Sequence, residues 1–318
     1  MKEVLVEAGV STAAHGTFSD EAAALAFLDT MDGLFVVKTD GLAAGKGVVV
    51  TTDRAEAVDA VRSYLSGDAF GDAGRTLVIE EGLTGPELSV LAICDGHDAV
   101  ALAPAQDFKR LGDGDAGPNT GGMGAYSPAP RVDAELHRRI MDEVIHPTVR
   151  GLAEEGMPYL GFLYAGLMID TQGNPRVLEY NCRFGDPETQ PILMRMRSDL
   201  AGLCQAALDG ELDRFRIEWD PRFALGVVMV ADGYPGEYPR GDKISGLQDI
   251  MSDNIKVFHA GTRQESGQTV TDGGRVLCVT ALGATVDAAQ QAAYGTVSTI
   301  HWPGAGWRPD IGWRALNR

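Results

Sequence analysis

The sequence from residue 177 to residue 190 reads V-L-E-Y-N-C-R-F-G-D-P-E-T-Q and combines a strand pattern with polar groups. Its first residues are mostly apolar, which is typical of a short buried strand. Glu179 and Asn181 are two positions apart, so on a strand their side chains lie on the same face. A carboxylate and an amide oxygen side by side are hard oxygen ligands, suited to Mg²⁺ shared with phosphates. The stretch therefore predicts a metal site near the end of a strand.

The rest of this stretch adds a possible phosphate clamp and a turn. Arg183 presents a planar guanidinium that can hold a phosphate or a carboxylate through two hydrogen bonds. The residues from Phe184 to Pro187 then turn the chain, and Glu188 begins a helix. The alternative interpretation is an edge strand with solvated polar residues and a helix cap, because short motifs also arise by chance. The stretch by itself leaves both interpretations open.

The composition is that of an acidic globular protein. The chain has 318 residues, of which 44% are hydrophobic, and its net charge is −18. The length predicts two or three domains, and the negative charge argues against binding to nucleic acids or anionic membranes. No apolar run approaches a membrane span, and the first residues do not resemble a secretory signal. The four scattered cysteines are typical of a reducing compartment, so we expect a soluble, cytoplasmic protein.

A glycine-rich loop, T-D-G-L-A-A-G-K-G, follows a predicted strand at residues 34–38. Gly45 and Gly47 let backbone amides approach an anion closely, and Lys38 and Lys46 can add point charges to phosphate oxygens. The spacing differs from that of a Walker loop, and glycine stands where that loop needs a hydroxyl. Two interpretations therefore remain: a flexible hairpin that covers phosphates, or a plain hairpin with two solvated lysines.

Helical and strand-like segments alternate along the chain and predict an α+β fold. The main expected elements are a small α+β unit at 18–82, a long irregular loop at 106–130, two paired strands at 161–170 and 175–180, a helix at 191–208, and a β-rich domain from about 222. A structureless loop as long as the one at 106–130 is usually functional or disordered, and its mixture of glycine, aromatic and charged residues favours function.

Taken together, several segments resemble phosphoribosylamine–glycine ligase, a purine-biosynthesis family of the ATP-grasp superfamily. The matching motifs are, in chain order, V-V-K-T-D-G-L-A-A-G-K-G, I-E-E-G-L-T-G-P-E, Q-D-F-K-R, G-P-N-T-G-G-M-G-A-Y-S-P, G-F-L-Y-A-G-L-M, E-Y-N-C-R-F-G-D-P-E-T-Q and D-I-G-W-R-A. The resemblance covers essentially the whole chain. It implies an ATP-grasp fold divided into a remnant of an N-terminal domain or linker (1–17), a lid subdomain (18–82), a catalytic core (83–221) and a small β-rich C-terminal domain (222–318).

The resemblance also implies roles for individual residues. Glu179 and Asn181 would be the ligands of Mg²⁺ or Mn²⁺. The implied nucleotide- and substrate-binding residues comprise lid groups on the phosphates, a hinge that reads adenine, a ribose-binding acid and a glycine-side loop: Lys38, Gly45, Lys46, Gly47, Glu80, Glu81, Leu83, Glu87, Asn119 and Thr120. The implied catalytic residues are Asp107, Lys109, Arg183 and Asp186, with Arg110 in the same loop.

The implied reaction is the ATP-dependent joining of glycine to 5-phosphoribosylamine through a glycyl phosphate. Positioning and charge neutralisation supply the catalysis, so no side chain needs to become a covalent nucleophile. The implied partners are therefore the small molecules ATP, glycine and 5-phosphoribosylamine, with no nucleic acid and no membrane, and we expect a monomer.

Two alternatives stay open at this point. Another ATP-grasp ligase, joining a different acid and amine, would share the nucleotide-binding residues and differ around residues 106–126. A non-catalytic nucleotide-binding fragment would share every visible motif, because the first domain of the family, with its own glycine-rich loop, has no counterpart in this sequence.

Overall fold

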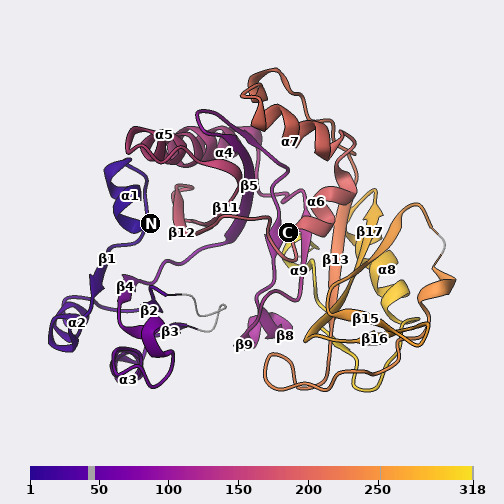
Figure 1. The fold of residues 1–318 in the computed structure, drawn as a ribbon, viewed down its shortest axis with the longest axis horizontal. Helices are drawn as coiled ribbons and strands as arrows, with labels where there is room; N and C mark the ends of the chain where they lie inside the picture. Colours follow the sequence, from indigo (N-terminus) through magenta and orange to yellow (C-terminus); the bar gives the residue numbers. More distant parts are fainter. Residues whose placement is uncertain (42–46, 251, 317–318) are drawn as a thin grey trace. The chain divides into compact units, whose positions relative to one another are not determined.

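A computed structural model describes residues 1–41, 47–250 and 252–316 of the chain (Figure 1). The contacts divide the chain into two compact units. Unit 1 comprises Met1–Pro86 and Met168–Leu178, and unit 2 comprises Glu87–Leu167 and Glu179–Arg318. Both contain helices and strands, which confirms the predicted α+β class. In the part of the chain that the structure describes, no helix is both long and apolar enough to cross a membrane.

Unit 1 is built on an antiparallel four-stranded sheet that carries two helices. The strands lie in the order β1 (His15–Phe18), β4 (Leu77–Glu81), β2 (Phe35–Thr39) and β3 (Val48–Thr51). Helices α2 (Glu21–Leu28) and α3 (Arg54–Leu65) pack against the sheet and against each other. A short helix, α1 (Lys2–Glu7), precedes them. The strand predicted at residues 34–38 is confirmed as β2, and helices and strands both occur within the predicted α+β unit at 18–82.

The sequence of unit 1 explains why its two sheet-packing helices begin where they do. The side chain of Asp20 accepts a hydrogen bond from the backbone nitrogen of Ala23 (2.9 Å), and that of Asp53 accepts one from Ala55 (2.8 Å). Aspartate is a favoured residue at this position because it satisfies an amide that the helix leaves unpaired. The buried residues of both helices then meet the sheet in one apolar core: Ala24, Leu28, Ala57, Ala60, Val61, Tyr64, Phe35, Val37, Leu77 and Ile79.

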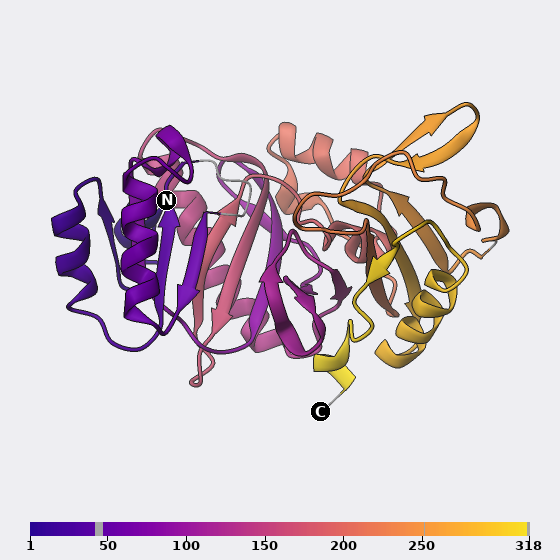
Figure 2. The ribbon, with the colours of Figure 1, turned by 90° about the horizontal axis from the view of Figure 1, so that it is seen from below.

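Unit 2 contains a sheet that joins segments distant in the sequence (Figures 1 and 2). Its strands follow the order β14 (Ile255–His259), β17 (Arg275–Gly283), β13 (Phe223–Val230), β10 (Gly124–Ser127) and β7 (Gln106–Asp107), and β18 (Gly306–Trp307) also pairs with β13. Helices α6 (Thr189–Arg195) and α8 (Val286–Val297) pack on β13 and β17. A hairpin of β15 (Thr262–Glu265) and β16 (Gln268–Thr271) projects from this unit in Figure 2.

A second sheet has the order β12 (Pro175–Asn181), β11 (Leu160–Ile169), β5 (Glu87–Asp95) and β6 (Ala99–Ala101). The division between the two units passes through β11 and β12. Helix α7 (Leu200–Leu208) packs on β5, and α4 (Ala134–Ile140) continues through a π-helical turn into α5 (His146–Glu154). The predicted strand pair at 161–170 and 175–180 is confirmed.

The prediction of an irregular loop at 106–130 is wrong. This segment contains β7, β8 (Arg110–Gly112), β9 (Ala116–Asn119) and β10. Strand β10 pairs with β13 on one side and β7 on the other, and its glycine and alanine have no intrinsic strand preference. At Gly124 a Cβ atom would lie 2.5 Å from the backbone oxygen of Gly226, so the close approach of the strands requires glycine there. Long-range pairing therefore creates strands that the local pattern hides.

The single helix predicted at 191–208 is also wrong, because the structure divides it into α6 and α7. Helix α6 ends at Arg195 and α7 begins at Leu200. The side chain of Asp199 accepts hydrogen bonds from the backbone nitrogens of Ala201 (3.1 Å) and Gly202 (3.0 Å). This cap starts a new helix and outweighs the apolar periodicity that runs across the break.

The core of unit 2 offers a direct test of the fold. Leu277 in β17 is fully buried, so Leu277→Ala should lower the free energy of unfolding by about 2–5 kcal/mol through lost burial and the cavity left behind. The matched control is Leu208→Ala, because Leu208 at the end of α7 is 66% exposed and its loss should change stability by no more than about 0.5 kcal/mol. Urea denaturation of both variants measures the difference, and equal effects would contradict this description of the core.

Candidate functional site

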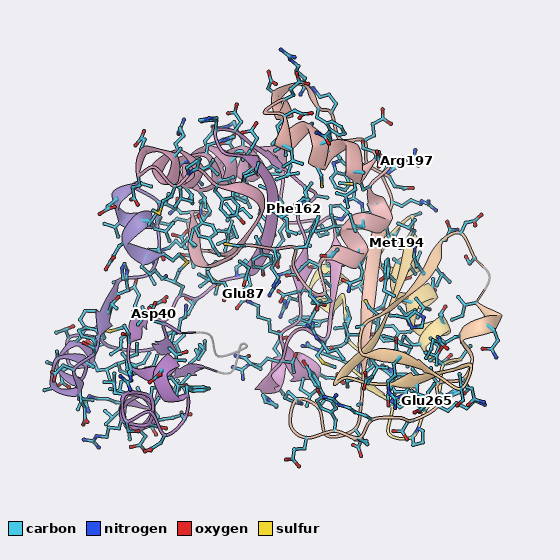
Figure 3. The ribbon with its side chains drawn as sticks, in the orientation of Figure 1. Asp40, Glu87, Phe162, Met194, Arg197 and Glu265 are labelled. Carbon is cyan, nitrogen blue, oxygen red and sulfur yellow. The ribbon has the colours of Figure 1, made fainter. Side chains whose placement is uncertain are left out.

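A lysine lies between two carboxylates in unit 2. The Nζ atom of Lys109, just after β7, is 3.2 Å from Oε2 of Glu87 and 3.8 Å from Oε1 of Glu179. Glu87, labelled in Figure 3, is the first residue of β5, and Glu179 lies near the end of β12. Burial lowers the pKa of Lys109, but Asp107, Glu87 and Glu179 raise it by more, so the pKa lies well above its ordinary value. The ammonium therefore stays charged at any physiological pH.

Asp107 is the buried acid of this cluster. It lies opposite Ala125 in the ladder between β7 and β10, and only 6% of the residue is exposed. Burial raises the pKa of its carboxyl to about 7; Lys109 opposes this shift, while Glu188 and Glu87 add to it. A group with a pKa near 7 can release or accept a proton at neutral pH, as acid–base catalysis requires.

Glu188 is a second buried acid, at a position predicted only to begin a helix. Its Oε1 accepts a hydrogen bond from Ser89 Oγ at 2.8 Å, and the hydroxyl of Tyr164 is 3.1 Å from the same Oγ. Burial raises the pKa of Glu188, and its side chain makes no capping hydrogen bond to the helix that follows. Its place at the end of a polar motif is consistent with a site residue. Glutamate is so common at helix starts, however, that the sequence could not distinguish a buried acid from an ordinary helix start.

Glu179 and Asn181 occupy alternate, half-buried positions on β12, as predicted. Gly166 leaves room for this arrangement, because a Cβ atom there would lie 3.2 Å from Cγ of Glu179. No group of three or more His, Cys, Asp or Glu residues suited to a metal occurs among residues 1–41, 47–250 and 252–316. One carboxylate and one amide oxygen nevertheless fit Mg²⁺ that completes its coordination with phosphates and water, which is the usual mode for this ion.

Thr120 and Asp186 are occupied in holding loops of unit 2 together. The hydroxyl of Thr120 donates to the backbone oxygen of Lys109 (2.8 Å) and accepts from the nitrogen of Gly122 (3.0 Å). The carboxylate of Asp186 pairs with Arg275 of β17 at 2.7 Å, and the same arginine donates to the backbone oxygen of Gly121. These contacts support the loops around Lys109, while the predicted binding and catalytic roles stay predictions.

The structure does not join three other predicted residues to this cluster. Arg183 is exposed and donates to the backbone oxygen of Phe184 (2.7 Å). Arg110 donates to the oxygen of Gly117 (2.8 Å), and Asn119 pairs with Arg110 across β8 and β9 on an exposed edge. Within the described part of the chain, none of the three makes a hydrogen bond or an ion pair with the Lys109 cluster.

Unit 1 contains a separate charged group around Glu80, at the end of β4. The carboxylate of Glu80 is nearly fully buried and pairs with Lys38 at 2.9 Å and with Lys2 at 3.0 Å. Burial lowers the pKa of Lys2, and Glu80 opposes that shift. Lys38 also donates to the backbone oxygen of Leu178 at 3.3 Å. The structure thus brings together two residues, Lys38 and Glu80, that the sequence assigned to different parts of a nucleotide site.

The remaining predicted residues of unit 1 have simpler surroundings. Glu81 accepts a hydrogen bond from Ala14, pairs with Arg176 at 2.8 Å, and its pKa is lowered chiefly by the bond from Ala14. The backbone oxygen of Gly47 accepts from the nitrogen of Thr39, and Leu83 is half-buried. The predictions for Gly45 and Lys46 lie outside the described residues.

Matches to known protein families cover almost the whole chain. The model described as "Phosphoribosylglycinamide synthetase, ATP-grasp (A) domain" matches residues 1–189, and the model of the C domain matches residues 224–314. The phosphoribosylamine–glycine ligases of Vibrio parahaemolyticus and Allochromatium vinosum are 56% and 58% identical over 317 residues, which are 100% of this chain and 74% of each relative.

Solved structures agree with these matches. The crystal structure of phosphoribosylamine–glycine ligase from Thermotoga maritima matches 98% of this chain and 77% of its own, with a TM-score of 0.90 and 33% identity. The biotin carboxylase domain of Hydrogenobacter thermophilus 2-oxoglutarate carboxylase, solved with magnesium ADP and bicarbonate, covers 96% of this chain and 66% of its own with a TM-score of 0.73. Its identity is 18%, so that likeness shows the fold alone. The predicted ATP-grasp fold with a C-terminal domain is therefore confirmed.

The buried Asp107 predicts a specific dependence of stability on pH. The folded protein keeps this proton up to about pH 7, whereas the unfolded chain releases it near pH 3.8. The folded state therefore binds more protons across this window, and Asp107 makes the free energy of unfolding fall as pH rises from about 4 to about 7. Asp107→Asn should remove this contribution to the decrease in the free energy of unfolding.

Urea denaturation between pH 4 and pH 8 measures the effect. The control is Asp113→Asn, which makes the same substitution at an exposed aspartate nearby in the sequence. A wild-type protein and an Asp107→Asn variant with parallel profiles would contradict the raised pKa.

Proposed function

This chain belongs to the phosphoribosylamine–glycine ligase family of ATP-grasp enzymes, and from that premise we propose that the cluster around Lys109 is where it activates glycine and joins it to 5-phosphoribosylamine. One observation carries the proposal. A charged lysine lies between Glu87 and Glu179, beside a carboxyl of Asp107 whose pKa of about 7 suits proton transfer. The chain spans 74% of the length of the first curated relatives.

The chemistry follows from the demands of amide formation in water. The carboxylate oxygen of glycine attacks the γ-phosphorus of ATP, the bond from that phosphorus to the bridging oxygen breaks, and ADP leaves with the electron pair. The amine of 5-phosphoribosylamine then attacks the acyl carbon, phosphate departs, and the nitrogen loses one proton. Lys109 neutralises negative charge on the phosphoryl oxygens, and Asp107 in its ionised form accepts the proton of the amine.

A divalent cation fits the donor set of β12. Glu179 and Asn181 would hold it, together with phosphate oxygens of the nucleotide, and the cation would neutralise charge on the transferring phosphoryl group. Hard oxygen ligands and shared phosphates favour Mg²⁺, although the same ligands also suit Mn²⁺. Lys38 of unit 1 remains the predicted lysine for the nucleotide phosphates, with Lys46, Gly45 and Gly47 as the predicted loop.

We also propose that the protein acts in the cytoplasm as a monomer. All four cysteines are free thiols, which supports a reducing compartment. Sedimentation velocity at micromolar concentration would test the monomer directly, and a concentration-dependent increase in mass would contradict it.

Product analysis tests the proposed reaction. The chain is incubated with Mg²⁺, ATP, glycine and 5-phosphoribosylamine, and ADP, phosphate and the glycinamide ribonucleotide are measured together. Equal amounts of all three are expected, with no product when glycine is omitted. ADP formation with another acid or amine, and none with this pair, would favour a different ATP-grasp ligase. Nucleotide binding without any product would favour a non-catalytic nucleotide-binding fragment.

The assignment of Glu179 to the metal predicts the effect of replacing one of its carboxylate oxygens. Glu179→Gln keeps the shape of the side chain and removes its charge, so kcat should fall about 100-fold or more while the fold is retained. Glu218→Gln is the control, because Glu218 is exposed and its side chain accepts no hydrogen bond in the described structure.

The test of this prediction is steady-state ADP release over a range of Mg²⁺ concentrations. Thermal melting checks that the variant is folded. Near-normal turnover of Glu179→Gln at ordinary Mg²⁺ would remove Glu179 from the metal site.

A further inference from the structure

The side chain of Phe108, between the proposed catalytic residues Asp107 and Lys109, contacts two arginines from the end of the chain. Its ring is fully buried. The guanidinium carbon of Arg314 lies 4.4 Å from the ring centroid, and that of Arg308 lies 4.9 Å from it. Two cations within about 5 Å of one aromatic centroid restrain the ring by electrostatic attraction as well as by packing.

The same two arginines hold the backbone on either side of Phe108. Nη1 of Arg314 donates to the backbone oxygen of Asp107 at 2.9 Å, and Nη1 of Arg308 donates to that of Arg110 at 3.2 Å. The segment from Asp107 to Arg110 is therefore bound at both of its ends and at the ring between them. Each of these contacts crosses about 200 residues of sequence.

The charges of the arginines are compensated locally. Asp115 pairs with Arg308 at 2.8 Å and with Arg314 at 2.7 Å, and Asp310 also pairs with Arg308. Burial would raise the pKa of Asp115, but hydrogen bonds from the two arginines hold it below its ordinary value. The side chain of Arg308 has no exposed surface at all. A fully buried charge is costly even when paired, and apolar side chains could fill the same space, so packing alone is a poor account of these arginines.

We propose that Arg314 and Arg308 are positioning residues. By clamping Phe108 and the backbone on either side of it, they aim Asp107 and Lys109 into the reactive cluster. Phe108 links the two residues directly, so fixing its ring and the backbone oxygens on either side of it limits where Asp107 and Lys109 can point. This inference rests on the proposed function of the Lys109 cluster. It gives the C-terminal segment a part in catalysis although none of its side chains needs to touch a substrate.

Graded variants of Arg314 test the proposal. Arg314→Ala should lower kcat about 10–100-fold, as outer-shell changes do, while the KM for ATP changes less than about twofold. Arg314→Lys should fall between the wild type and Arg314→Ala, because lysine keeps the charge but cannot present a planar fork to Asp107 and Asp115 at once. The control is Arg240→Ala, which removes an arginine stacked on an aromatic ring at an exposed site and should leave kcat unchanged.

The pH profile supplies a readout that a merely structural role would not move. Asp107 faces Lys109, Glu188, Glu87 and Arg314, and Arg314 acts to lower its pKa. Loss of Arg314 should therefore shift the acid limb of kcat to higher pH in Arg314→Ala, and much less in Arg314→Lys. Hydrogen exchange of residues 106–124 gives a second readout that is independent of activity. Exchange should increase in Arg314→Ala and stay at the wild-type rate in Arg314→Lys and Arg240→Ala.

The outcomes separate the two proposals. Wild-type protein that makes no ligation product overturns the proposed function, and the exchange measurement then decides the clamp. If the wild-type protein is active, and Arg314→Ala has a normal kcat, a normal acid limb of the pH profile and normal hydrogen exchange, then the clamp is overturned and the proposed function stands. One further result overturns the positioning role. In it, the loss of kcat in Arg314→Ala matches a loss of folded protein measured by thermal melting, and Arg314→Lys restores kcat fully without any shift of the acid limb.

Discussion

The site in unit 2 depends on the cost of burying carboxyl groups away from water. Asp107 and Glu188 are almost completely buried, and Lys109 lies beside them with Glu87 and Glu179. An ammonium in such surroundings stays charged because carboxylates surround it, and buried carboxyls keep their protons longer because water no longer stabilises the anion. The same desolvation that makes the cluster expensive to fold brings the pKa of Asp107 to about 7, where it can serve proton transfer.

The geometry of that cluster comes from segments far apart in the chain. Asp107 belongs to a strand of two residues, β7, which exists only because β10 pairs with it, and β10 in turn pairs with β13. Arg314 and Arg308 hold the adjoining segment, and Arg275 of β17 holds Asp186 and Gly121. The β-rich end of the chain therefore supports the loops around the Lys109 cluster of the same unit, and this is the kind of rigid positioning that the proposed reaction requires.

Unit 1 satisfies its own buried charge in the same way. Glu80 at the end of β4 is paired with Lys38 of the adjacent strand and with Lys2 of α1. Two lysines share this one carboxylate, while the phosphate-binding role of Lys38 stays a prediction. The sequence placed Lys38 and Glu80 in one nucleotide site without indicating that their side chains pair, because their adjacency depends on the register of β2 against β4.

Local patterns determined a large part of this protein. Apolar periodicity located most helices and strands, the alternation at Glu179 and Asn181 put two oxygen-bearing side chains on one face, and the long motifs identified the family. The tertiary structure alone decided the rest. It made strands of the glycine-rich segment at 106–130, split the helix at Asp199, and turned Glu188 from a helix start into a buried acid. It also brought Arg314 to Asp107 across about 200 residues. Sequence patterns report the interactions between near neighbours, whereas strand pairing and the burial of charge depend on partners that only the folded chain brings together.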